Sequence, residues 1–268
     1  MNSNHTTSCA IAHGLNTQGF FSYEVPSNII IFVHGFGGSA TGTWNNFLSM
    51  ILFDDHFKKT DVIFYGYDTL KGQASDHSAQ LYNFLNLLES PGRNHILPPL
   101  QNLPERSYQS ILLVAHSLGA VLVRQAQLLA SIADKQWVDK SKLALFAPAH
   151  NGAQIVLLAL ESLPGLLTLL GVIAKFKYPI LSDLTPGEGL LKNIKEHTKD
   201  LQNQGKGDFS KAQLVIHAKG DKVIRNHQYL LDSPARVIEN SNHTKVCKPT
   251  QVYSEPLEYI KSIVKING

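Results

Sequence analysis

The chain has 268 residues, 43% of them hydrophobic and 17% charged, so it can bury the core of one large domain or two small ones. Its formal net charge of +3 is too small to predict a nucleic-acid or membrane partner from electrostatics. The two cysteines, Cys9 and Cys247, show no metal-ligand or redox spacing, which argues against a disulfide framework and favours a reducing compartment.

The first residues and the hydropathy pattern contain no targeting or membrane signal. The stretch MNSNHTTSCAIAHG lacks a basic region and a long apolar run, so no signal peptide is expected. No segment approaches about 18 uninterrupted apolar residues, so no transmembrane segment is expected either. These features predict a cytoplasmic protein.

Buried strands alternate with helical segments in the first part of the chain. Phe20–Val25 alternates weakly, which favours an edge strand, whereas Ile29–Val33 is an unbroken run typical of a strand covered on both faces. A short helix over Trp44–Phe53, a strand over Asp61–Tyr65 and a longer helix over Ala74–Glu89 are expected next. A Pro-rich polar stretch, SPGRNHILPPLQNLPERS, is then expected to form a surface connection.

The same alternation continues to the C-terminus. Ile111–Ala120 (ILLVAHSLGA) leads from a strand through a serine into a helix. Lys142–Ala147, Gln213–Ala218 and Ala235–Ile238 are predicted strands, and Glu255–Val264 is a predicted closing helix. This pattern predicts an α/β fold with a doubly wound, mostly parallel sheet and helices on both faces.

The alternation stops between about residues 150 and 210, where no strand is predicted. We interpret this region as a helical cap inserted into a single domain that spans residues 1–268. Its leucines are too dense to lie entirely in water, so they form either ordinary core or a lid that opens at a lipid surface. The basic stretch Lys192–Lys211 is interpreted as a solvated face.

Ser117 is the candidate nucleophile. It lies in A-H-S-L-G, a variant of the G-x-S-x-G elbow in which Ala115 replaces the first glycine. A strand, a tight turn and a helix would present its hydroxyl group, and the small neighbouring residues would let the strand and helix approach closely. The simpler alternative is a serine that caps an ordinary helix.

Asp221 and His243 are the candidate acid and base. A serine hydroxyl needs a base to remove its proton, and a buried acid fixes the tautomer of that base. Asp221, in AKGDKVI, follows one predicted strand, and His243, in NSNHTKV, follows the next. The order serine, aspartate, histidine along the chain is the one expected of an α/β-hydrolase and differs from the orders in the serine proteases.

Other acids and bases are weaker alternatives. No predicted strand precedes Asp183 or Asp208. Among the 12 histidines, His217 lies inside a predicted strand, and His197 and His227 lie in polar segments.

Backbone N–H groups would supply the oxyanion hole. One donor is expected from Leu118, directly after the nucleophile, and the other from Phe36 in the glycine-rich loop HGFGG. His34 and Gly35 belong to the same loop, and His34 is expected to shape it.

Two further histidines are expected near the site. His116 precedes the nucleophile and is expected to be structural, and His150, in PAHNG, follows a strand and could line the site. With His34 and Gly35 they form the candidate substrate-binding set. No metal ligands are predicted.

Several blocks of the sequence resemble the α/β-hydrolase superfamily: FVHGFGGSATGTW, VAHSLGA, FAPAHNGA, AKGDKVI and NHTKVCKP. Within it, the chain resembles serine esterases and lipases, including the GPI inositol-deacylase-like and serine-active-site-containing-protein groups. The blocks cover roughly Ile29–Ala153 and Gln213–Val264 and leave the cap unmatched. The resemblance implies hydrolysis of a carboxylic ester through an acyl-enzyme, without a cofactor.

The expected partner is a small-molecule or lipid ester, with contact to a membrane surface through the cap if the cap is a lid. A non-catalytic binding module with the same fold and an acyltransferase with the same three residues remain alternatives. The sequence predicts neither the acyl chain nor the alcohol part of the ester, because members of this superfamily differ mainly in the cap.

Overall fold

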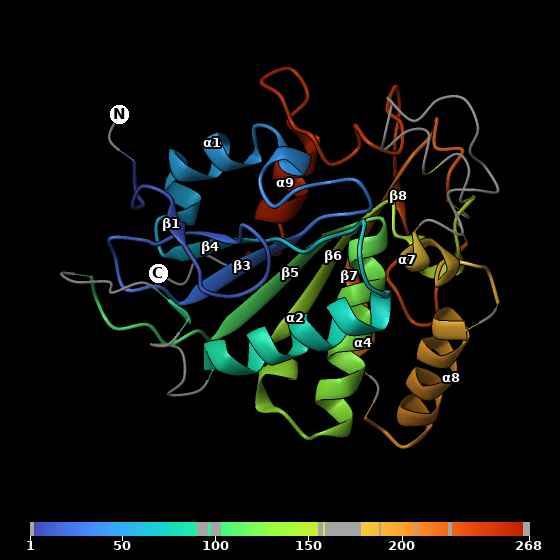
Figure 1. The fold of residues 1–268 in the computed structure, drawn as a ribbon. Coiled ribbons are helices and arrows are strands. Elements are labelled where there is room, and N and C mark those ends of the chain that lie inside the picture. The colour runs from blue at the N-terminus through green and yellow to red at the C-terminus, as the bar shows by residue number, and fades with distance from the viewer. Residues whose placement is uncertain are drawn as a thin grey trace.

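The computed structural model describes residues 3–89, 96–97, 103–154, 158, 178–187, 189–206, 208–224 and 227–264. Within them, eight strands form one sheet in the spatial order β1-β2-β4-β3-β5-β6-β7-β8 (Figure 1). From β4 to β8 all neighbours are parallel, whereas β1 and β2 pair antiparallel at one edge. The strands are β1 (Cys9–Ala10), β2 (Gln18–Phe20), β3 (Asn28–Val33), β4 (Thr60–Tyr65), β5 (Ser110–His116), β6 (Ser141–Phe146), β7 (Ala212–Ala218) and β8 (Arg236–Ile238).

Helices cover both faces of the sheet, as the sequence pattern predicts. Figure 1 shows α1 and α9 on one side and α2 and α4 on the other. The helices are α1 (Phe47–Leu52), α2 (Ala74–Glu89), α4 (Leu118–Ile132), α7 (Pro179–Ser182), α8 (Gly189–Asn203) and α9 (Glu255–Lys261). Short 3-10 helices are η1 (Gly42–Trp44), η2 (Asp55–Phe57), η3 (Gln136–Val138), η4 (Ala149–Asn151) and η5 (Asp208–Ser210).

The central strands are buried on both faces, which explains their unbroken apolar runs. All residues of β3 and β4 are buried, and in β5 only Ser110 is partly exposed. Helix α4 is buried over most of its length because it lies between the sheet, α2 and α8. The nucleophile candidate therefore stands between two of the best-packed elements of the molecule.

Two predicted elements differ in position. The edge strand expected over Phe20–Val25 ends at Phe20, because the N–H of Ser22 donates to the Asp61 carboxylate instead of to a ladder partner. The helix expected over Trp44–Phe53 is divided into η1 and α1, because Asn45 adopts a positive φ of 48° between them.

The Pro-rich connection is less superficial than predicted, because Arg106 near its end is buried. Its Nε donates to Asp61 Oδ2 at 2.8 Å, and its Nη2 donates to the carbonyl of Ser22 at 2.9 Å. The hydroxyl of Tyr108 donates to the same Asp61 oxygen at 2.8 Å. This network joins the connection to the start of β4 and to the turn after β2.

The described parts of the predicted cap are helical. They include η4, α7, α8 and η5, and Ala153 forms an isolated antiparallel bridge with Ile224. Leu158 is buried. Leu181, Leu184 and Leu191 are buried as well. The other leucines between residues 157 and 170 lie outside the described residues, and so does the expected contact with a lipid surface.

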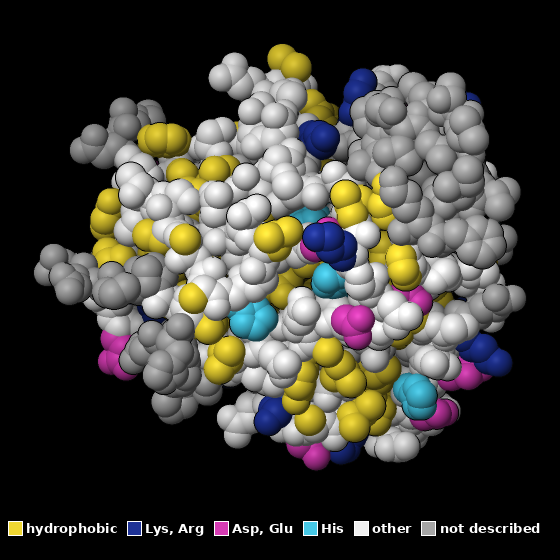
Figure 2. Space-filling model, viewed as in Figure 1, with side chains coloured by type: hydrophobic (Ala, Val, Ile, Leu, Met, Phe, Trp, Pro, Cys, Tyr) yellow, Lys and Arg dark blue, Asp and Glu magenta, His cyan; other side chains and the backbone are white. Residues whose placement is uncertain are grey.

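Figure 2 shows the molecular surface from the same side. Basic and acidic side chains are interspersed on this face and do not form one continuous field of either sign. No helix in the described parts of the chain is long and apolar enough to cross a membrane.

Candidate active site

Ser117 occupies a strained turn between β5 and α4. Its φ of 51° and ψ of −118° lie in a region that side-chain-bearing residues rarely adopt. Two backbone hydrogen bonds hold the turn: the N–H of Ser117 donates to the carbonyl of Phe146 at 3.0 Å, and the N–H of Ala149 donates to the carbonyl of Ser117 at 3.1 Å. The end of β6 therefore fixes the conformation of the elbow.

Close packing explains the small residues around the elbow. A Cβ atom on Gly119 would lie 2.3 Å from the carbonyl oxygen of Val33 and 2.5 Å from that of His34. One on Gly35 would lie 2.9 Å from the Cβ of Ser117. Ala115, which replaces the first glycine of the motif, is fully buried in β5 and pairs with Val33 in the parallel ladder.

The structure brings Ser117, His243 and Asp221 into one chain of hydrogen bonds. His243 Nε2 lies 2.8 Å from Ser117 Oγ, and His243 Nδ1 lies 2.9 Å from Asp221 Oδ2. The side chains of His243 and Asp221 are fully buried, and Ser117 is 1% exposed. The three residues follow β8, β7 and β5, whose carboxyl ends share one edge of the sheet.

Asp221 is held in its ionised form. Burial alone would raise the pKa of its carboxyl group, but the hydrogen bond and the charge interaction with His243 lower it, as do N–H groups. The N–H groups of Val223 and Ile224 donate to Oδ1 at 2.8 and 3.3 Å, and the net pKa lies below the ordinary value. The acceptor of the His243 Nδ1–H is thus a fixed carboxylate.

The alternative acids and bases are engaged elsewhere. Asp183 accepts from the N–H of Ala74 at 2.8 Å, and Asp208 begins η5. His197 Nδ1 pairs with the carbonyl of Asn193 within α8, and His217 lies inside β7. Among the described residues, none of them hydrogen-bonds with Ser117 or His243.

The two expected oxyanion donors belong to segments that adjoin Ser117: Leu118 follows it directly, and Phe36 follows Gly35, on which a Cβ would lie 2.9 Å from the Cβ of Ser117. Leu118 is the first residue of α4, and its N–H has no partner one turn earlier in the helix. Phe36 belongs to the turn His34–Gly38, in which the N–H of Gly38 donates to the carbonyl of Gly35. Gly37 has a positive φ of 69°, and its N–H donates to Thr69 Oγ1. No described residue accepts a hydrogen bond from the N–H of Phe36.

Comparison with solved structures gives the fold. The mature lipase BlEst2 of Bacillus licheniformis aligns with 96% of this chain and 96% of its own at a TM-score of 0.56 and 16% identity. The naproxen esterase of Bacillus subtilis aligns over 98% and 92% at a TM-score of 0.52 and 12% identity. The chain has the α/β-hydrolase fold.

A third neighbour of this fold is larger. Phospholipase PlaB of Legionella pneumophila aligns with 91% of this chain but only 60% of its own length, at a TM-score of 0.59 and 14% identity. No family model and no curated protein matches the chain. At these identities the shared property is the α/β-hydrolase fold.

Within this fold, both ring nitrogens of His34 form hydrogen bonds, one of them inside the loop that His34 is expected to shape. Nδ1 donates to the carbonyl of Gly35 at 2.9 Å, and Nε2 accepts from the N–H of Tyr67 at 3.3 Å. The ring stacks on that of Tyr67 with centroids 4.4 Å apart. Burial lowers the pKa of His34 to about 4, so the ring is neutral at physiological pH.

His116 and Gly35 line a cavity beside Ser117. This cavity of about 150 Å³ is also lined by the Phe36 loop and by Thr244 and Lys248, to which the sequence analysis assigned no role of their own. Both lie in the block NHTKVCKP that carries part of the family resemblance.

His150 lies in η4 on the side of the elbow that faces α8. It is buried, and its Nδ1 accepts a hydrogen bond from Arg124 Nε at 3.2 Å. Its ring lies over that of Tyr229, with centroids 4.3 Å apart. The structure thus places His150 against α4 and α8, and in the described residues it makes no hydrogen bond with the three residues of the Ser117 chain.

Sequence patterns missed the buried ion pair behind His150. Arg124 lies on α4, and its guanidinium donates to Asp232 and to the carbonyl of Ser210 while it covers the ring of Tyr229 at 4.3 Å. Asp232 also accepts from the N–H of Ala212 at 2.9 Å.

The described residues contain no group of three or more His, Cys, Asp or Glu side chains that could hold a metal ion.

Proposed function

We propose that this α/β-hydrolase cleaves carboxylic esters through a covalent acyl-enzyme on Ser117. The observation that carries the proposal is the hydrogen-bonded chain from Ser117 Oγ through His243 to Asp221, with distances of 2.8 and 2.9 Å. The similarity in fold to a lipase, an esterase and a phospholipase supports it. No cofactor enters the reaction.

Acylation begins when His243 Nε2 takes the proton of the Ser117 hydroxyl as Oγ attacks the ester carbonyl carbon. The carbonyl oxygen becomes an oxyanion, which the N–H groups of Leu118 and Phe36 stabilise. Each such donor contributes about 3 kcal/mol to the transition state in related reactions. The tetrahedral intermediate collapses as His243 gives its proton to the leaving alkoxide, which departs as the alcohol.

Deacylation reverses these roles with water as the nucleophile. His243 removes a proton from water, the hydroxide attacks the acyl carbon, and Ser117 leaves with a proton from His243. The ionised Asp221 fixes the tautomer of His243 and stabilises the imidazolium in both halves. An acyltransferase would use the same first half and an acceptor alcohol in the second, so the identity of the product separates the two.

A non-catalytic binding module is the competing proposal. Such a module needs no hydrogen-bonded histidine and carboxylate behind a buried serine, and the contacts of His243 with Ser117 and Asp221 therefore weigh against it. The strained φ of Ser117 also favours catalysis, because strain of this kind persists mainly at functional sites.

The test is turnover of p-nitrophenyl acyl esters by the wild-type chain and by Ser117→Ala. The proposal predicts turnover by the wild type and its loss in the variant, with an unchanged circular dichroism spectrum. Turnover that persists in Ser117→Ala would assign the reaction to another group. Product analysis with an added alcohol distinguishes hydrolysis from acyl transfer, and a series of acyl-chain lengths defines the preferred ester.

A further inference from the structure

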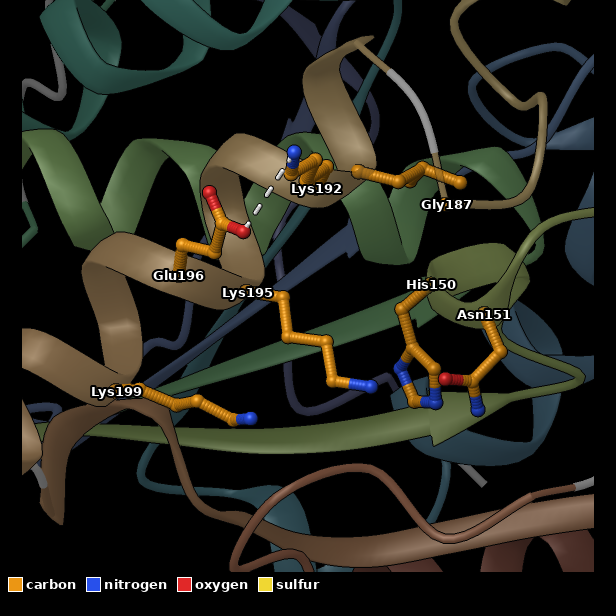
Figure 3. Close-up of a pocket in the computed structure, with 8 residues that line it drawn as sticks. His150, Asn151, Gly187, Lys192, Lys195, Glu196 and Lys199 are labelled. Atoms are coloured by element: carbon orange, nitrogen blue, oxygen red, sulfur yellow. Dashed lines mark ion pairs between the residues drawn. The ribbon is translucent and has the colours of Figure 1, made fainter.

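A basic pocket lies between α8 and η4, beside the nucleophile elbow but outside the Ser117 chain of hydrogen bonds. Its volume is about 310 Å³, within the range of small-molecule sites. Lys192, Lys195 and Lys199 line it from α8, and His150 and Asn151 line it from η4 (Figure 3). The prediction of a solvated face is confirmed for these three lysines, all of which are exposed, and their helical spacing also turns them to one pocket.

The charges of the pocket are distributed unevenly. Glu196 is its one acidic side chain among the described residues, and it pairs with Lys192 at 3.9 Å. Figure 3 shows Lys195 and Lys199 extending from α8 toward His150, while Glu196 turns toward Lys192. Neither Lys195 nor Lys199 pairs with a carboxylate in the part of the chain that the structure describes. Two ammonium groups are therefore available on the His150 side.

His150 adds a buried hydrogen-bond donor of fixed tautomer. Because Arg124 Nε–H donates to Nδ1, that nitrogen carries the lone pair and the neutral ring carries its proton on Nε2. Burial, then the charges of Arg124, His217 and Lys195, hold the pKa of His150 well below its ordinary value, so the ring is neutral. His150 is 5% exposed, and no described residue accepts a hydrogen bond from Nε2.

Packing against the ring of Tyr229 fixes the position of the His150 donor. The centroid of the Tyr229 ring lies 4.3 Å from Arg124 Cζ and 4.3 Å from the centroid of the His150 ring. The ammonium nitrogen of Lys195 lies 5.9 Å from the same centroid. Asp232 neutralises Arg124 from behind. The wall of the pocket is thus preorganised, and Lys195 and Lys199 extend toward it without a carboxylate partner among the described residues.

We propose that this pocket binds a phosphate group, with Lys195 and Lys199 as charged donors and His150 Nε2–H as a neutral donor. Three donors around one anion suit the oxygens of a phosphate better than they suit a neutral ligand. The η4 residues adjoin the elbow, since the N–H of Ala149 donates to the carbonyl of Ser117. The phosphate is either free phosphate or part of an ester substrate, and the second possibility rests on the proposed function.

Binding is measured first without catalysis, by calorimetric titration of inorganic phosphate into the full chain that carries Ser117→Ala. Adding Lys195→Gln and Lys199→Gln should weaken phosphate affinity about tenfold or more, since two charge-assisted contacts are lost. Lys71→Gln with Lys135→Gln removes the same charge at exposed positions outside the pocket and should leave affinity unchanged. Equal affinity in both double variants, or no phosphate binding at all, overturns the proposal.

Steady-state kinetics with Ser117 intact distinguishes free phosphate from a phosphate-bearing ester as the ligand. If a phosphate-bearing ester is the substrate, Lys195→Gln with Lys199→Gln raises KM for phosphatidic acid in mixed micelles and leaves KM for a neutral diacylglycerol unchanged. If the double substitution weakens the binding of inorganic phosphate but leaves both KM values unchanged, free phosphate is the ligand. If the chain binds phosphate but hydrolyses no ester, the phosphate site is supported and the proposed function is wrong.

Discussion

His116 Nε2 donates a hydrogen bond to the backbone carbonyl of His243 at 2.8 Å, so the residue before Ser117 holds the loop that carries His243. The two rings lie with centroids 5.0 Å apart. Burial, followed by the charge of His243, lowers the pKa of His116 to about 3, so its ring stays neutral and can donate only from Nε2. The sequence predicted a structural role for His116, and this contact supplies one.

Replacement of His116 by phenylalanine should therefore lower kcat for ester hydrolysis by about tenfold with little change in KM, because a buried carbonyl loses its donor and the His243 loop loosens. His116→Gln keeps an N–H group at a similar reach and should recover most of kcat. A fall in KM and kcat alike, or no recovery with glutamine, would assign His116 another role.

Asp221→Asn should lower kcat by about 10⁴-fold, as in the serine protease in which the acid of the triad was changed to Asn, because the amide favours the wrong tautomer of His243. Steady-state kinetics with an activated ester measures this loss. Binding of a substrate analogue should change little, since Asp221 contacts His243 and not the ester.

The same residue predicts a pH dependence of stability. The pKa of Asp221 is lowered in the folded chain, so its contribution is fully present above the ordinary value of 3.8 and is lost as pH falls through the folded pKa. Urea unfolding at a series of pH values should show the wild type losing stability relative to Asp221→Asn below about pH 4. Parallel curves for the two proteins would contradict the assigned ionisation.

The elbow offers a pair of opposite substitutions. Gly119→Ala places a Cβ 2.3 Å from a backbone carbonyl oxygen and should lower the free energy of unfolding by about 3 kcal/mol. Ala115→Gly restores the first glycine of the motif and should cost only about 1 kcal/mol, through backbone entropy, without loss of kcat. Denaturant unfolding and ester turnover, measured together, check both expectations.

The buried ion pair between Arg106 and Asp61 should stabilise the start of β4. Arg106→Met leaves the Asp61 carboxylate buried without its guanidinium and should destabilise the chain by about 3 to 5 kcal/mol. Adding Asp61→Asn removes the unpaired charge and should recover part of that loss. If the double variant is less stable than Arg106→Met alone, other groups compensate the charge of the Asp61 carboxylate and the expectation is wrong.

The sequence predicts the parts of this molecule that depend on local pattern. Unbroken apolar runs identify β3 to β7, and parallel strands place their carboxyl ends at one edge, which is why Asp221 and His243 could be assigned to meet Ser117. The assignment also used the A-H-S-L-G motif and the order of serine, aspartate and histidine along the chain.

The missed features depend on contacts between distant segments. Arg124 lies in a helix like many exposed arginines, and only the fold buries it against Asp232, 108 residues further along the chain. The basic pocket has the same origin, since the lysines of α8 acquire a role only when His150 is packed opposite them. The end of β2 at Phe20 likewise depends on Asp61, which is 39 residues away from Ser22.

Labelling with a fluorophosphonate probe, followed by peptide mass spectrometry, tests directly whether Ser117 is a nucleophile activated by His243. We expect one stoichiometric adduct on Ser117 in the wild type and a large loss of labelling rate in His243→Gln, because the base that activates Oγ is gone. Absence of an adduct on Ser117, or equal labelling rates in the wild type and His243→Gln, would contradict it.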